Sequence, residues 1–117
     1  MGKWVPCGER FIVGDVIRWT EPIWLESAKR KQGKKAVRKI GERRVTAEVV
    51  AIDARDYVSL SVCACEIVSN KEGRLLEPFK KKQVIRKKRS TIGKGSGERL
   101  KWSEEGARSL AASKFLS

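Results

Sequence analysis

Apolar and polar positions alternate most regularly in two stretches near the middle of the chain. From Val45 to Ile52 and again from Tyr57 to Cys65, every second residue is apolar, with partly apolar residues between them. A period of two is typical of β-strands, in which alternate side chains lie on the same face. The intervening Asp53–Asp56 has the composition of a turn. The pattern therefore predicts a long β-hairpin.

Shorter runs predict further elements on either side of this hairpin. Phe11–Val13 and Val16–Trp19 are two β-favouring runs separated by a Gly-Asp turn, and Val84–Ile85 predicts a strand within a basic stretch. Towards the end, Ser103 is a suitable N-cap, and apolar residues then recur at helical spacing. We expect a C-terminal helix over residues 103–116.

These elements predict a mainly β protein. About five short strands and one terminal helix in 117 residues fit a single domain spanning residues 1–117, built as a small antiparallel barrel. Residues 11–19, Phe-Ile-Val-Gly-Asp-Val-Ile-Arg-Trp, resemble the first strands of the SH3-like barrels found in nucleic-acid and translation proteins. The resemblance implies an SH3-like barrel, and an OB-like barrel is the alternative.

The positive charge is concentrated in two segments. The chain holds 27 Lys and Arg against 14 Asp and Glu, which gives +13. Residues 26–44 contain nine bases and two acids, net +7, and residues 71–101 contain twelve bases and three acids, net +9. Between Glu26 and Lys39 the apolar side chains are limited to two alanines and Val37. Such a stretch buries too little apolar surface to offset its ordering entropy, so we expect a basic loop insertion at 26–44, or a loosely ordered hairpin tip.

Cations packed this closely repel one another unless an anion neutralises them, and a nucleic-acid backbone is the densest common polyanion. We therefore expect a nucleic-acid-binding protein that contacts phosphates with little base-specific readout, and the sequence leaves DNA and RNA equally open. The expected contacts are Lys29, Arg30, Lys31, Lys34, Lys35, Arg38, Lys39, Arg43, Arg44, Lys80, Lys81, Lys82, Arg86, Lys87, Lys88, Arg89, Lys94, Arg99 and Lys101. One alternative is a protein-interaction module that docks on an acidic protein or a ribonucleoprotein assembly. Another is a solvated basic surface without a specific ligand.

Aromatic side chains beside these segments could stack on bases, which is worth about 1–3 kcal/mol per base. Trp24 borders the first basic segment and is the leading candidate, followed by Trp19 and Tyr57. The competing interpretation is that each of these rings belongs to the core.

The sequence gives no support to catalysis, a metal site or a cofactor. The chain has no His, and its acidic residues are scattered, so no nucleophile has an identifiable base. Cys63 and Cys65 are expected on one face of a strand, with Cys7 remote from them, and three thiols without His do not complete an ordinary zinc site. We expect a non-enzymatic protein whose cysteines are small buried residues.

No apolar run approaches the roughly 18 residues needed for a membrane-spanning helix, and no signal-peptide pattern opens the chain. The odd number of cysteines fits a reducing compartment. These features favour a cytoplasmic protein without a membrane partner.

Overall fold

A computed structural model describes residues 3–31, 34–102, 105–106 and 108, with side chains for all of these except 26–36. Its elements, in chain order, are β1 (Trp4–Pro6), β2 (Val16–Lys31), β3 (Lys34–Ile52), β4 (Tyr57–Asn70), β5 (Val84–Lys88), α1 (Arg89–Lys94) and β6 (Glu98–Leu100). The helix predicted over residues 103–116 falls almost entirely outside the described residues.

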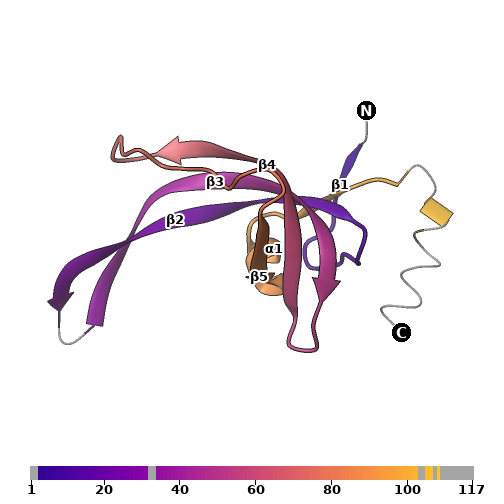
Figure 1. The fold of residues 1–117 in the computed structure, drawn as a ribbon, viewed down its shortest axis with the longest axis horizontal. Coiled ribbons are helices and arrows are strands. Elements are labelled where there is room, and N and C mark those ends of the chain that lie inside the picture. Colours follow the sequence, from indigo (N-terminus) through magenta and orange to yellow (C-terminus); the bar gives the residue numbers. More distant parts are fainter. Residues whose placement is uncertain (1–2, 32–33, 103–104, 107, 109–117) are drawn as a thin grey trace.

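All strand pairs are antiparallel, and the six strands form one unclosed sheet in the order β1-β6-β2-β3-β4-β5 (Figure 1). The mainly β prediction is confirmed. The described strands do not close the sheet, because β1 and β5 are its two edges. The long, twisted β2–β3 pair dominates the molecule, which measures 52 × 32 × 22 Å.

The core lies on one face of the sheet, where alternate residues of three long strands are buried. The face includes Trp19 of β2, Val45 of β3 and Leu60 of β4, which are at most 1% exposed. Phe11 from the loop before β2 and Ile92 of α1 cover it and are fully buried. The helix and the N-terminal loop therefore form a lid over the curved sheet, and the opposite face is left to solvent.

The hairpin predicted from alternation is confirmed as β3 and β4. The turn between them is held by Asp53, whose Oδ1 accepts backbone N–H bonds from Arg55 at 2.8 Å and Tyr57 at 3.0 Å. An Asp that bonds the backbone two residues ahead is the physical basis of this turn.

Residues 26–44 differ from the loop insertion that their composition indicates. They lie in strands β2 and β3, whose pairing is interrupted by an irregularity between Glu26 and Arg30 and resumes at Arg30–Lys35 and Lys31–Lys34. A strand pair satisfies its backbone hydrogen bonds whatever its side chains are, so a sequence poor in apolar residues can still extend a hairpin whose base is anchored in a core. Of the two interpretations of residues 26–44, the hairpin tip is therefore closer to the structure than the loop insertion.

Two further elements differ from the sequence pattern. Phe11–Val13 is not a strand: its residues form the buried loop that covers the core. The short β6 was not predicted. It can lie beside β2 because Gly95, which precedes it, packs directly against the backbone of Thr20 in β2. A side chain at Gly95 would collide with the backbone carbonyl of Thr20, whose N–H donates to the Gly95 oxygen at 3.0 Å.

Cys63 and Cys65 do not share the environment that strict alternation predicts. The pairing of β3 with β4 shifts between Thr46 and Ala47, which inserts an extra residue into β4. Cys63 is therefore exposed, whereas Cys65 packs against the core. Cys7 is half-buried, and burial, reinforced by the charge of Asp15, raises the pKa of its thiol to about 11.

Candidate nucleic-acid interface

The far halves of β2 and β3 form a two-stranded projection, which we call the basic ribbon (residues 24–31 and 34–39). The pairing of β3 with β4 ends at Gly41 and Asn70, and β6 pairs with β2 only at Ile17 and Arg18. Among the described strands, no third strand pairs with the ribbon. Figure 1 shows it projecting away from the rest of the molecule.

The register of the ribbon places cationic residues directly opposite one another. Arg30 pairs with Lys35, and Lys31 pairs with Lys34. Directly opposed positions in an antiparallel pair have neighbouring Cβ atoms, so like charges there oppose strand pairing. Two-stranded hairpins are at best marginally stable in water even without this repulsion. The end of the ribbon therefore gathers four positively charged residues in an arrangement that an anion would stabilise.

Nearer the body, the ribbon carries two exposed apolar side chains on one face. Trp24 pairs with Lys39, and Val37 stands two residues before Lys39 on β3, so the three share a face. Trp24 is 57% exposed and Val37 is 52% exposed. On the other face Arg38 donates two hydrogen bonds to Glu72, at 2.7 and 2.8 Å.

In the second segment, three consecutive lysines form an exposed turn before β5. Lys82 has a positive φ of 70°, and the Lys80 N–H donates to the side chain of Gln83 at 2.9 Å. Lys80, Lys81, Lys82 and Lys88 form no ion pair with any described residue. Four cations of this segment are thus available to an external anion.

Strand alternation divides the rest of β5 between the two faces of the sheet. Arg86 and Lys88 lie on the solvent face, where Arg86 pairs with Asp53 and covers the ring of Tyr57 at 4.3 Å. Lys87 lies on the core side. A run of cations that looks continuous in the sequence is therefore not one continuous surface.

The two basic segments meet at a buried carboxylate, Glu21, which is 3% exposed. Its Oε2 accepts from Arg43 of the first segment at 2.6 Å and from Lys87 of the second at 2.9 Å. Its Oε1 accepts the indole N–H of Trp19 at 2.8 Å. Phe79 lies beside both cations, 4.2 Å from the Arg43 guanidinium and 5.5 Å from the Lys87 amine. This cluster connects the base of the ribbon to β5.

The electrostatics of Glu21 follow from these contacts. Burial alone would raise the pKa of the carboxyl, but hydrogen bonds from Lys87, Trp19 and Arg43 outweigh it and hold the pKa below its ordinary value. Glu21 is therefore ionised at neutral pH. Arg43 and Lys87 neutralise it, so neither belongs with the unpaired cations.

Several other predicted contacts also form internal ion pairs. Arg44 approaches Glu66 at 3.9 Å, Lys39 pairs with Glu42 at 3.0 Å, and Arg89 pairs with Asp56 at 3.4 Å. Arg99 pairs with Glu105 at 2.9 Å, whereas Lys94 and Lys101 are exposed. The structure places Lys29, Arg30, Lys31, Lys34 and Lys35 on the ribbon, although their side chains are outside the described ones.

The three stacking candidates have different surroundings. Trp19 is 1% exposed, and its N–H is occupied by Glu21, so its assignment as a stacking residue is wrong in this structure. Tyr57 is half-buried, and Arg86 covers its ring. Trp24 is exposed, as a stacking or groove-contacting side chain must be.

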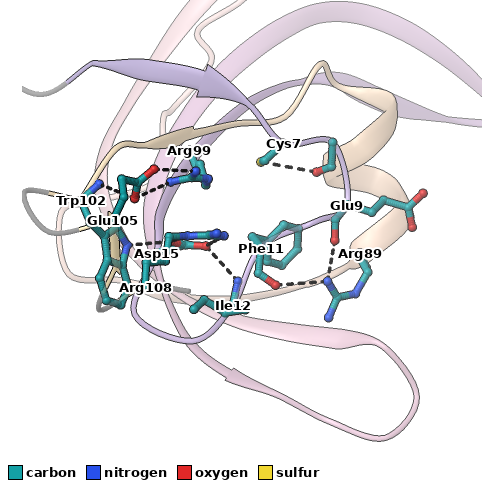
Figure 2. A network of polar contacts seen from close by, with 11 residues as sticks. Cys7, Glu9, Phe11, Ile12, Asp15, Arg89, Arg99, Trp102, Glu105 and Arg108 are labelled. Carbon is teal, nitrogen blue, oxygen red and sulfur yellow. Dashed lines mark hydrogen bonds and ion pairs between the residues drawn. The ribbon is translucent and has the colours of Figure 1, made fainter. Parts of the chain in front are cut away.

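Sequence reasoning missed a second buried carboxylate, Asp15, which is fully buried (Figure 2). It accepts the Ile12 N–H at 2.9 Å, the Trp102 indole N–H at 2.7 Å and two hydrogen bonds from Arg108, at 2.9 and 2.8 Å. Glu105 continues the cluster through the Trp102 N–H. Asp15 looks like an ordinary turn residue, and its partners are 87 and 93 positions away, so no sequence signal revealed the cluster.

The donors also control the ionisation of Asp15. Burial would raise the pKa of this carboxyl, but the hydrogen bonds from Arg108, the Ile12 N–H and Trp102 hold it below its ordinary value. Because the Asp15 carboxylate has hydrogen-bond partners within the protein, it is a structural group that ties Trp102 and Arg108 to the loop over the core.

The described residues contain no group of three or more His, Cys, Asp or Glu side chains that could hold a metal ion. No helix within the described ranges is long and apolar enough to cross a membrane. Comparison of the chain with models of protein families, with curated proteins and with solved structures found no match.

Proposed function

We propose that this protein binds nucleic acid without catalysing a reaction, and that the basic ribbon and the unpaired lysines before and within β5 contact the phosphate backbone. The observation that carries the proposal is the cross-strand register of Arg30 with Lys35 and of Lys31 with Lys34. A phosphate backbone between and beside these cations removes their repulsion, and release of its counterions supplies binding free energy.

The internal ion pairs reduce the number of basic residues that we propose as phosphate contacts. Arg38, Arg43, Arg86 and Lys87 are engaged with carboxylates. We therefore assign the principal contacts to the ribbon end, because of its register, and to Lys80, Lys81, Lys82 and Lys88, which form no ion pair with a described residue. Backbone contacts of this kind orient a protein on a nucleic acid but carry little sequence information. Recognition is therefore expected to be largely independent of sequence.

The competing function is docking on an acidic protein or a ribonucleoprotein assembly. Lysines on β5 also have a structural explanation, because charged edge strands prevent edge-to-edge aggregation. That explanation does not extend to the ribbon, where the cations oppose pairing of their own strands. The SH3-like or OB-like barrel form and the cytoplasmic location stay predictions.

The proposal is tested by measuring affinity for a labelled oligonucleotide of about 20 residues between about 50 and 200 mM salt. We expect log affinity to fall linearly with log salt. Replacing Arg30, Lys31, Lys34 and Lys35 with Gln should reduce the slope by roughly 0.7 for each phosphate of a single strand that the variant no longer neutralises. The melting temperature should not fall.

A matched variant separates a dedicated surface from bulk charge. Lys3, Arg10, Arg55 and Lys71 are exposed and form no ion pair with a described residue, so replacing them with Gln removes the same charge elsewhere. We expect this control to bind nearly as well as the unmodified protein. Equal losses in both variants, or no oligonucleotide binding at the lowest salt together with tight capture of an acidic protein, would contradict the proposal.

A further inference from the structure

The shape of the basic ribbon bears on the class of nucleic acid that it fits. The ribbon projects from the body (Figure 1), whereas proteins that bind single strands hold them in a groove lined with aromatic side chains. Two hollows of the described surface lie on the body, one of about 470 Å³ between Phe11 and Arg89 and another beside Gly97. A projecting ribbon is suited to entering a groove of its ligand.

The dimensions of the ribbon match one groove in particular. Paired strands are about 4.8 Å apart, and from Lys34 to Lys39 the β3 side of the ribbon extends roughly 17 Å at about 3.3 Å per residue. The major groove of B-form DNA is about 12 Å wide and admits a two-stranded ribbon. The major groove of A-form RNA is too deep and narrow for side chains to read. Measured along the helix axis of B-form DNA, the same length covers about five phosphates of each strand.

The distribution of residue chemistry along the ribbon agrees with insertion into a groove. Cationic residues on both strands at its end would lie near phosphates on both sides of the groove. Trp24 and Val37 lie on one face nearer the body and are exposed. Apolar side chains in the major groove contact thymine methyl groups and base edges, which a single strand does not present in a fixed geometry.

On this basis, and resting on the proposed function, we infer that the ligand is double-stranded DNA, and that the basic ribbon enters its major groove with Trp24 and Val37 against base edges. The geometric support is that no third described strand pairs with the ribbon. The chemical support is that cationic residues lie opposite one another at its end and that Trp24 and Val37 are exposed on one face.

The test compares a DNA duplex of about 20 base pairs with its single strand and with an RNA duplex of the same sequence at one salt concentration. We expect the DNA duplex to bind at least about tenfold more tightly than either, which corresponds to about 1.4 kcal/mol. Methyl green, which occupies the major groove, should displace the protein, whereas the minor-groove ligand netropsin should not.

Substitutions locate the contact. The double variant Trp24→Ala, Val37→Ala should lose about tenfold in duplex affinity and nothing in single-strand affinity, with an unchanged melting temperature. Leu75→Ala is the matched control, because Leu75 is 93% exposed and lies off the ribbon. It should bind like the unmodified protein.

The outcomes distinguish this inference from the proposed function. Equal affinity for single strands or RNA duplexes, or displacement by netropsin alone, overturns the inference and leaves nucleic-acid binding intact. Absence of binding to all three ligands at low salt overturns both. An unaltered duplex affinity in the Trp24, Val37 variant overturns the assignment of the apolar pair.

Discussion

The body of the sheet and the basic ribbon are built from the same two strands, yet they handle charge in opposite ways. In the body, the strands bury apolar residues, and the cations Arg43 and Lys87 meet a buried carboxylate. In the ribbon, Arg30 and Lys31 are paired with Lys35 and Lys34. The body therefore neutralises these cations internally, whereas the register at the end of the ribbon sets cationic residues opposite one another.

The comparison shows that net charge alone is a poor guide to a binding surface. The chain carries +13, but many of its cations are used to hold the molecule together. What distinguishes a candidate contact is a cation without an acidic neighbour. By that criterion the lysines before β5 differ from Arg43, Lys87 and Arg108, each of which is paired with a carboxylate. The ribbon end is distinguished by its register, which sets cationic residues opposite one another.

The largest expected contrast in stability is between a core residue and a ribbon residue. Leu60→Ala should lower the free energy of unfolding by about 2–5 kcal/mol, because it leaves a cavity in the buried face. Val37→Ala should change it by less than about 0.5 kcal/mol, because Val37 is exposed on the ribbon. Urea unfolding of both variants provides the measurement. Similar losses would show that the ribbon is part of the cooperative body.

An intermediate effect is expected at the carboxylate that joins the two basic segments. Glu21→Gln keeps the shape of the side chain but leaves Arg43 and Lys87 without a counter-charge, so it should cost about 1–3 kcal/mol. Its effect should also depend on pH. Because the folded pKa of Glu21 lies below its ordinary value of 4.5, its contribution is fully present above that value and is lost as pH falls through the folded pKa.

Unfolding free energies measured from pH 7 down to about 3 test this dependence. Stability should decrease with acidity below about pH 4.5 in the unmodified protein, because Asp15, whose pKa is also lowered, contributes in the same direction. Glu21→Gln should flatten the decrease without abolishing it. An unmodified protein that gains stability on acidification would contradict the assignment of both buried carboxylates.

The smallest effect is expected where the ribbon touches the turn after β4. Glu72 is exposed, and its hydrogen bonds from Arg38 and Arg74 lower its pKa to about 2. Exposed ion pairs contribute little to stability, so Glu72→Gln should leave the melting temperature unchanged at neutral pH. Amide hydrogen exchange near Arg38 should become slightly faster. A fall in melting temperature as large as that of Glu21→Gln would show that this contact anchors the ribbon.

Much of the body could be predicted from local sequence. The β3–β4 hairpin and the strand at Val84 follow from alternation and turn chemistry, which act between neighbouring residues. The loop over the core could not be predicted, because Phe11 and Ile12 have the composition of a strand and are buried without being paired in one. The prediction of a loop at 26–44 failed because a low apolar content indicates only that little surface is buried. A hairpin anchored at its base can extend its strand pairing without burying apolar surface.

The candidate contacts, like the fold, include some that the sequence identified and some whose pairing it could not reveal. The sequence identified the two basic segments and favoured Trp24, since charge density and aromatic content can be read from the residues alone. The internal pairings of Arg43, Lys87 and Arg108 could not be found, because they depend on partners distant in sequence.

By itself, the sequence determined that the protein is mainly β, strongly basic and charged in two segments, since these properties depend on residue types and short-range periodicity. The tertiary structure alone decided which cations are neutralised, that Trp19 is buried while Trp24 is exposed, and that one basic segment projects as a paired ribbon. The physical reason is that burial and ion pairing are set by strand register and by contacts between distant residues, which local composition does not encode.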